Sequence, residues 1–216
     1  MEKFRESLEK LKMEVLDMGN LAVNMLSEAI ESMKTIDVGK ANEVYALKDK
    51  LMDYDDQIEI KALNLISLYQ PVARDIRSLA CILKLITYIT RIGRYGKDIA
   101  KIVIKELDGK EHIKKIVHIP KMTEDVISMI NDAINAFKYS EIEFIRDMAE
   151  RDDVVDEMRM EIFRECLTYM MENPKNISVC TAYILISRYL ERCGDHAAKM
   201  CEKIHYMVTG ERIEIK

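Results

Sequence analysis

Apolar side chains recur every three or four residues along most of the chain, a spacing that places them on one face of an α-helix. Between residues 4 and 34 the stripe consists of Leu8, Leu11, Val15, Met18, Ala22, Met25, Ala29 and Met33. Similar stripes predict six helices, over residues 4–34, 40–69, 72–107, 121–138 and 141–172 and from there to about residue 208. With only 7 glycines and 3 prolines in 216 residues, long uninterrupted elements are expected. We therefore predict an all-α protein.

Residues that disfavour helix mark the boundaries between these elements. The residue before a proline is pushed out of helical geometry, so Gln70-Pro71 should end the second helix and Asn173-Pro174 the fifth. Pro71 then suits the first turn of the third helix. The strongest turn signal is Asp108-Gly109-Lys110, after which the helical pattern starts again. We predict two successive units, residues 1–108 and 111–210.

The second unit repeats the first. The segment Tyr88–Arg94 (YITRIGR) matches Tyr189–Asp195 (YLERCGD) 101 residues later. Residues 48–53 match 151–156, and Gln70-Pro71 matches Asn173-Pro174, both at an offset of 103. Motif order, spacing and helix breaks agree, and three helices are enough to enclose a core. The predicted architecture is a tandem repeat of two three-helix bundles.

Two glycines interrupt the third predicted helix. Gly93 and Gly96 lie three residues apart, and each weakens a helix locally. We expect them to allow close approach of a neighbouring helix.

Charge and composition narrow the classes of partner. The net charge is −5, and basic residues are spread among acidic ones, which disfavours binding to a nucleic-acid backbone. No apolar run approaches the roughly 18 residues needed to span a bilayer, and the charged start does not resemble a signal peptide. We therefore expect a cytoplasmic protein. The five cysteines show no CxxC spacing and are expected to be free, mostly buried thiols.

Three acidic pairs share a spacing of four residues, which places both carboxylates on one helix face. The pairs are Asp49/Asp53, Asp152/Asp156 and Glu191/Asp195. Two like charges so placed repel by a few tenths of a kcal/mol when exposed. Nearby arginine and lysine residues can offset that cost, and so can bound cations, because hard cations and iron accept clusters of carboxylate oxygens. A metal site and a salt-bridged helix face are both consistent with the spacing.

Three segments resemble the PhoU family. Leu190-Glu-Arg-Cys-Gly-Asp-His-Ala197 is similar to the family signature Leu-Glu-Arg-Ile-Gly-Asp-His-Ala, and the other two are Gln70–Arg77 (QPVARDIR) and Leu167–Glu172 (LTYMME). The resemblance covers nearly the whole chain. It implies six helices in two bundles, and multinuclear metal clusters held by Glu/Asp-x-x-x-Asp motifs on the second and third helix of each repeat. It also implies a negative regulator of phosphate uptake, acting through the ATPase of the phosphate ABC transporter and, in many bacteria, a sensor histidine kinase.

The family's metal motif is intact at all three acidic pairs but fails in the third helix of the first repeat. Thr90 and Arg94 stand there, and a guanidinium only donates hydrogen bonds. Asp98, one turn further on, is an alternative ligand. We therefore expect at most one full cluster, with Glu191 and Asp195 as its surest ligands and with iron, zinc, magnesium and nickel all open as the metal.

Other charged residues leave alternatives open. Arg74, Asp75 and Arg77 follow the helix break and form either a partner interface or a solvated cap. His196 should have a hydrogen-bonding or surface role. Glu202 and His205 have the spacing of half a di-iron carboxylate site, which needs two copies, so chance explains them better.

The sequence contains no recognisable catalytic motif, and we expect no enzyme. Alternatives are a di-metal carboxylate enzyme, a PhoU-like accessory of another ion transporter, and a structural or oligomerising bundle. The expected partners are the transporter ATPase, a sensor kinase and a second copy in a homodimer, with the membrane approached only through the transporter.

Overall fold

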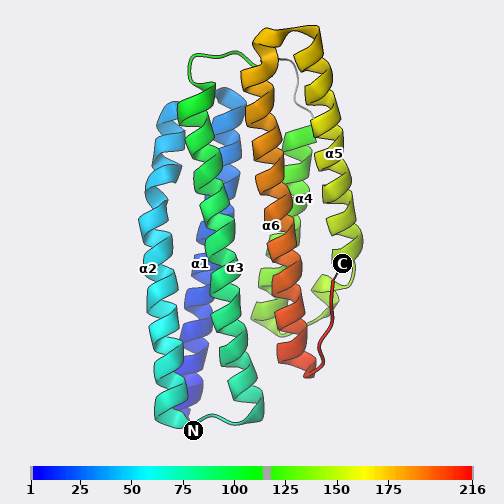
Figure 1. The fold of residues 1–216 in the computed structure, drawn as a ribbon. Coiled ribbons are helices and arrows are strands. Elements are labelled where there is room, and N and C mark those ends of the chain that lie inside the picture. The colour runs from blue at the N-terminus through cyan, green and yellow to red at the C-terminus, as the bar shows by residue number, and fades with distance from the viewer. Residues whose placement is uncertain (1, 114–117, 216) are drawn as a thin grey trace.

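Six long helices run through the computed structural model, which describes residues 2–113 and 118–215 (Figure 1). They are α1 (Glu2–Thr35), α2 (Val38–Tyr69), α3 (Ala73–Ile102), α4 (His118–Tyr139), α5 (Met148–Glu172) and α6 (Ile177–Thr209). Short helical turns are η1 (Val103–Leu107), η2 (Glu143–Ile145) and η3 (Pro174–Asn176). The described residues contain no strand, and the all-α prediction is confirmed. Residues 114–117 of the predicted second unit lie outside the described part.

α1 and α2 each begin two residues earlier than predicted, and the starts of three further helices differ for reasons that involve proline or the backbone. α3 begins two residues after Pro71, because Val72 has extended backbone (φ −111°, ψ 151°), so the placement of Pro71 in its first turn was wrong. α4 begins three residues earlier than predicted, which puts Pro120 in its first turn, a position proline tolerates. α5 begins at Met148 and not at residue 141, since Ser140 has a left-handed backbone (φ 57°) and η2 intervenes.

The two bundles lie side by side in antiparallel orientation around a central pair of helices. α1, α2 and α3 form one bundle and α4, α5 and α6 the other, and α3 packs against α6 in the middle (Figure 1). α3 runs upward in this view and α6 downward, so the repeats are related by a pseudo-twofold axis. α1 also contacts α4. The predicted tandem repeat of three-helix bundles is confirmed.

The outer helices α2 and α5 turn different faces towards the core when their residues are counted from the C-terminal ends of the helices. Their ends lie 103 residues apart, at Tyr69 and Glu172. Their equivalent buried positions, however, lie 104 residues apart, as in Val44 and Met148, Leu51 and Val155, Ile58 and Ile162, and Ala62 and Cys166. One residue corresponds to a rotation of about 100° around a helix. Polar positions matched at the sequence offset of 103 therefore face different directions in the two bundles.

The glycines of α3 lie where neighbouring helices approach closely, as predicted. A Cβ atom added at Gly96 would lie 2.9 Å from the backbone nitrogen of Leu26 and 2.9 Å from the carbonyl carbon of Met25, both on α1. One added at Gly93 would overlap Cδ2 of Leu51 on α2. Both sites are buried, so glycine sets the spacing of the first bundle.

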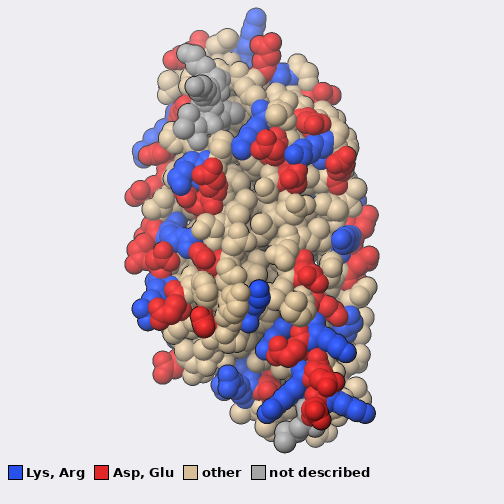
Figure 2. Space-filling view, turned by 180° about the vertical axis from the view of Figure 1, so that it is seen from behind, with Lys and Arg blue, Asp and Glu red and all other residues tan. Residues whose placement is uncertain are grey.

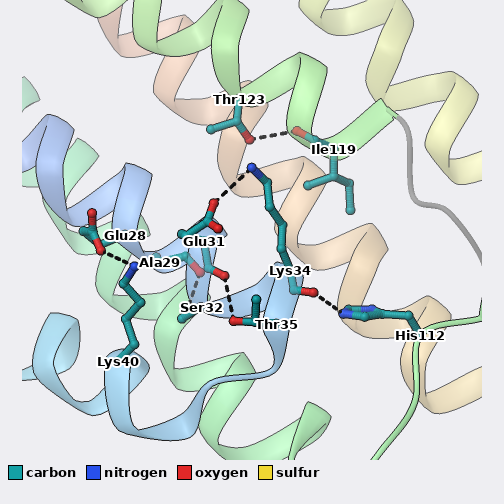
Figure 3. A network of polar contacts seen from close by, with 10 residues as sticks. All are labelled: Glu28, Ala29, Glu31, Ser32, Lys34, Thr35, Lys40, His112, Ile119 and Thr123. Carbon is teal, nitrogen blue, oxygen red and sulfur yellow. Dashed lines mark hydrogen bonds and ion pairs between the residues drawn. The ribbon is translucent and has the colours of Figure 1, made fainter.

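The connection between the repeats is fixed to both bundles through His112, and Figure 3 shows its contact with Lys34 of the first bundle. Its Nε2 lies 3.0 Å from the carbonyl oxygen of Lys34 at the end of α1, and its Nδ1 lies 2.6 Å from the hydroxyl of Tyr183 on α6. A carbonyl only accepts, so Nε2 donates to Lys34, while Nδ1 and the Tyr183 hydroxyl share the second hydrogen bond. One side chain thus bridges α1 and α6.

Acidic and basic side chains are mixed along both edges of the face seen from behind, with a band of uncharged residues between them (Figure 2). No described helix is long and apolar enough to cross a membrane. All five cysteines are free and buried, as predicted. Burial raises the pKa of the Cys81 and Cys166 thiols to about 12, which keeps them protonated.

Candidate functional site

Two of the three predicted acidic pairs come together between α5 and α6. Asp152 and Asp156 on α5 face Glu191 and Asp195 on α6, and we call these four residues the α5–α6 acidic cluster. Gly194 makes room for it, since an added Cβ there would lie 3.2 Å from Oδ1 of Asp152. The absent side chain lets a carboxylate approach the backbone of α6.

The carboxylates of this cluster hold protons more tightly than exposed ones do. Burial raises the pKa of Asp152 to about 6, and the charges of Asp195 and Asp156 add to the effect. Burial also raises the pKa of Asp156, again with a contribution from Asp195. For Glu191, burial raises the pKa and Arg159 partly opposes it. Burial is thus the main cause of the raised pKa values, and repulsion among the carboxylates adds to it.

Two arginines supply part of the compensation. Nε of Arg159 lies 3.5 Å from Glu191, and Nη1 of Arg192 lies 3.0 Å from Asp195. As the side chains are placed, no three potential ligands among the described residues converge on one point. The donor set of four carboxylates nevertheless suits a hard cation or iron. A bound ion would have to take the place of the arginines.

The third pair, Asp49/Asp53, does not join an equivalent site. Both side chains are exposed, because α2 is rotated relative to α5 by the equivalent of one residue, about 100°. The acid that faces Thr90 and Arg94 is Asp55, which sequence reasoning missed. Burial raises the pKa of Asp55, and the Thr90 hydroxyl and Arg94 oppose that shift. The first bundle thus places Thr90 and Arg94 near Asp55, where the second gathers four carboxylates.

Asp98, considered as a replacement ligand, lies elsewhere. It forms an ion pair of 2.9 Å with Lys97 and lines a groove between α3 and α6. That groove contains none of the acidic pairs.

His196 packs between the bundles. Its ring stacks on Tyr88 and Tyr95 of α3, at centroid distances of 5.8 and 5.9 Å, and burial lowers its pKa. Its Nε2 is buried and has no hydrogen-bond partner among the described residues. The structure thus shows a stacking role for the partly buried ring, which the sequence did not indicate.

Glu202 and His205 face different partners. The buried Glu202 carboxylate accepts hydrogen bonds from Lys199, Lys203 and the N–H of Ile215. Nδ1 of His205 contacts the carbonyl oxygen of Glu211. This arrangement fits the interpretation of their spacing as chance.

The three charged residues near the start of α3 do not form one surface. Arg74 and Asp75 line a cavity of about 340 Å³ beside Arg5 and Lys12 of α1. Arg77 turns instead towards Gly210, where its guanidinium would lie 3.8 Å from an added Cβ. Beside Arg74, residues 68–76 form a corner between α2 and α3, which we call the α2–α3 corner. It exposes 76% of both Leu68 and Val72.

The repulsion within the acidic cluster leads to a prediction about pH. With metal removed by a chelator, Asp152→Asn should stabilise the protein at pH 7 by about 1 kcal/mol after allowance for solvent screening. A carboxyl with a raised folded-state pKa contributes stability only while it is protonated, and that contribution is lost as pH rises from about 4 towards 6. Urea denaturation at pH 7 and pH 4 checks this. The gain should vanish at pH 4, and an equal gain at both values would contradict it.

The PhoU domain matches residues 15–103 and 119–204, which fall within the two predicted units. A "Phosphate-specific transport system accessory protein PhoU homolog" of Clostridium acetobutylicum is 32% identical and covers 98% of this chain and 97% of its own. A homolog of the same name from Caulobacter vibrioides is 34% identical over 97% of this chain and 91% of its own.

Solved structures of PhoU proteins have the same fold as this chain. The crystal structure of PhoU from Pseudomonas aeruginosa aligns with a TM-score of 0.91 at 29% identity, covering 96% of this chain and 100% of that one. A phosphate transport system regulatory protein PhoU from Streptococcus pneumoniae has the same fold, with a TM-score of 0.89 at 24% identity, covering 98% and 99%. With two domain matches and relatives alike along nearly their whole length, this chain belongs to the PhoU family.

Proposed function

We propose that this protein is a cytoplasmic accessory protein of phosphate-specific transport that restrains phosphate uptake when phosphate is plentiful. The observation that carries the proposal is the likeness, along nearly the whole chain, to proteins named as accessories of that transport system. The arrangement of two bundles sharing a central helix pair offers docking surfaces, and the proposed role is not catalytic. Where the organism has a sensor histidine kinase for phosphate, the same protein would report to it.

The proposed partner is the ATPase subunit of the phosphate transporter, and the proposed contact is the α2–α3 corner. Leu68 and Val72 are each 76% exposed, and Arg74 lies beside them at a cavity. Exposed apolar side chains next to an arginine are typical of protein interfaces. The corner lies at the lower end of the first bundle, away from the connection between the repeats (Figure 1).

We also propose that a metal ion binds at the α5–α6 acidic cluster, held by Asp152, Asp156, Glu191 and Asp195. The raised pKa of Asp152 and the proximity of its neighbours support this proposal, because a cation would relieve their repulsion. The ion would supply positive charge between the two helices. Arg159 and Arg192, which now lie beside Glu191 and Asp195, would be released.

Co-purification tests the docking surface. We expect the transporter's ATPase subunit, expressed with this protein, to be retained by the wild type and lost at least about tenfold with the double substitution Leu68→Glu and Val72→Glu, since burying charge in an apolar contact is costly. The matched control is the equivalent corner of the second bundle, changed by Met171→Glu and Ile177→Glu, where Met171 is 79% exposed. Equal retention by both variants would contradict the proposed contact.

A further inference from the structure

The surroundings of the α5–α6 acidic cluster can be matched, position by position, with the α2–α3 pair of the first bundle. Equivalent buried positions lie 101 residues apart in α3 and α6 and 104 apart in α2 and α5. Contacts between the helices obey both offsets at once. A Cβ atom added at Gly93 would overlap Leu51, and one added at Gly194 would lie 3.6 Å from Cγ1 of Val155. The two helix pairs therefore share one packing register.

In this register the four carboxylates of the acidic cluster have no acidic counterpart in the first bundle. The counterparts of Asp152, Asp156, Glu191 and Asp195 are, in that order, Lys48, Met52, Thr90 and Arg94. Two carboxylates are thus replaced by cations, one by a thioether and one by a hydroxyl group. The exchange also occurs in the other direction, since the counterpart of Arg159 is Asp55. The same positions therefore carry opposite charges in the two bundles.

The acids of α2 do not restore a cluster. Four of the five acids between residues 48 and 59 are exposed, namely Asp49, Asp53, Asp56 and Glu59. The fifth, Asp55, is half-buried, and burial raises its pKa, which the Thr90 hydroxyl and the charge of Arg94 oppose. On the side that faces α3, the half-buried carboxylate of α2 thus lies close to a cation of α3.

α3 contributes no carboxylate to this place. Its residues Ala73–Ile102 include two acids, of which Asp75 lies in the first turn. The other, Asp98, forms an ion pair of 2.9 Å with Lys97 and lines the groove between α3 and α6, not the contact with α2. Hard cations take about six or more oxygen ligands. In the second bundle both helices of the pair supply two carboxylates, whereas in the first bundle one helix supplies none.

Lys48 and Arg94 place positive charge at two of the ligand positions. An ammonium and a guanidinium group only donate hydrogen bonds, so neither can bind a metal ion, and each repels a cation nearby. The ammonium of Lys48 lies 4.9 Å from the centre of the Tyr45 ring, a cation–π contact within α2. The residues of the first bundle therefore do not fit the metal cluster that the family resemblance implies for each repeat.

We propose that Lys48 and Arg94 exclude a metal ion from the first bundle, so that the metal response of the protein is confined to the second. The inference rests on the proposed metal site between α5 and α6, and it names the residues that make the two bundles differ. The α2–α3 corner then belongs to the bundle whose structure does not depend on metal.

Reversing the exchange tests the proposal, with manganese(II) as the probe because it favours carboxylate ligands. Lys48→Asp/Thr90→Glu/Arg94→Asp, which we call the exchange variant, gives the first bundle the counterparts of three ligands. We expect it to hold at least one more manganese ion per chain than the wild type, by elemental analysis after gel filtration. The matched control, Lys50→Asp/Thr87→Glu/Arg91→Asp, makes the same substitutions at exposed positions of the same helices and keeps Lys48 and Arg94. It should hold as much manganese as the wild type.

A second variant covers the case in which glutamate at the buried position 90 prevents folding, which circular dichroism detects. Lys48→Asp/Arg94→Asp leaves Thr90 in place and should also gain manganese, with lower affinity. In both variants added manganese should slow amide hydrogen exchange in α2, whereas in the wild type it should not.

Two outcomes would overturn the proposal. One is a manganese content equal to that of the wild type in both variants, and the other is an equal gain in the matched control. The wild-type content is a separate readout. A wild type without bound manganese would count against the site between α5 and α6, while the difference between the exchange variant and the wild type would still decide whether Lys48 and Arg94 exclude the ion.

Discussion

Replacing Gly96 by alanine should lower the free energy of unfolding by about 2 kcal/mol, although alanine favours helix over glycine by about 1 kcal/mol. The added methyl group would lie 2.9 Å from backbone atoms of Leu26 and Met25. Backbone atoms cannot rotate aside, so α1 and α3 must separate and lose packing along their length. In a chain of this size the melting temperature should fall by about 4–8 °C, which calorimetry or urea denaturation measures.

Gly194→Ala is the matched control for this prediction. It also places a methyl group in the middle of a buried helix face, but the nearest atom, at 3.2 Å, is the carboxylate oxygen of Asp152. The end of a side chain can move, so the stability in the presence of a chelator should change by less than about 1 kcal/mol. Equal losses in the two variants would show that backbone contact is not the reason for glycine at position 96.

Adding a suitable metal ion should raise the melting temperature of the wild-type protein by about 5–10 °C at a hundredfold excess over the dissociation constant. The reason is that the ion binds only the folded arrangement, in which α5 and α6 bring four carboxylates together. Magnesium, manganese, ferrous iron, zinc and nickel are tested in turn after chelator treatment. Asp195→Asn should abolish most of the shift, because Asp195 acts on both Asp152 and Asp156.

The variant Asp53→Asn tests whether the metal binds at the α5–α6 acidic cluster or at Asp49/Asp53, the other acidic pair predicted from the sequence. Asp53 belongs to a predicted metal pair, but it is exposed on α2 and lies outside the α5–α6 acidic cluster. This variant should therefore keep the full metal-induced shift. If Asp53→Asn lost the shift and Asp195→Asn kept it, the metal would be bound through the first bundle and our assignment would be wrong.

Sequence patterns were sufficient to predict the equivalence of the central helices α3 and α6 and the close approach of a neighbouring helix to α3. The match between residues 88–94 and 189–195 predicted that α3 and α6 are equivalent, and their buried positions do follow the offset of 101, as in Ile89 and Leu190. Glycine spacing predicted the close approach at Gly96. Both signals are local, and the helical period converts them directly into a face.

The arrangement of the outer helices was not predictable from the same signals. The match at an offset of 103 aligned Asp49/Asp53 with Asp152/Asp156, but burial follows an offset of 104, so α2 presents Asp55 to Thr90 instead. A sequence offset measures position along a helix and not the rotation chosen by packing. Leu51 against Gly93 decides that rotation in the first bundle. The stacking of His196 on Tyr88 and Tyr95 likewise depends on contacts between the bundles.

The initial rate of labelled phosphate uptake, in cells grown with abundant phosphate, tests the central claim most directly. Cells lacking this gene should take up phosphate several-fold faster than the parent strain, and a wild-type copy should restore the low rate. Phosphate-starved cells serve as the control, since uptake there should already be high in both strains. Equal uptake by the two strains at both phosphate levels would contradict a role in restraining phosphate transport.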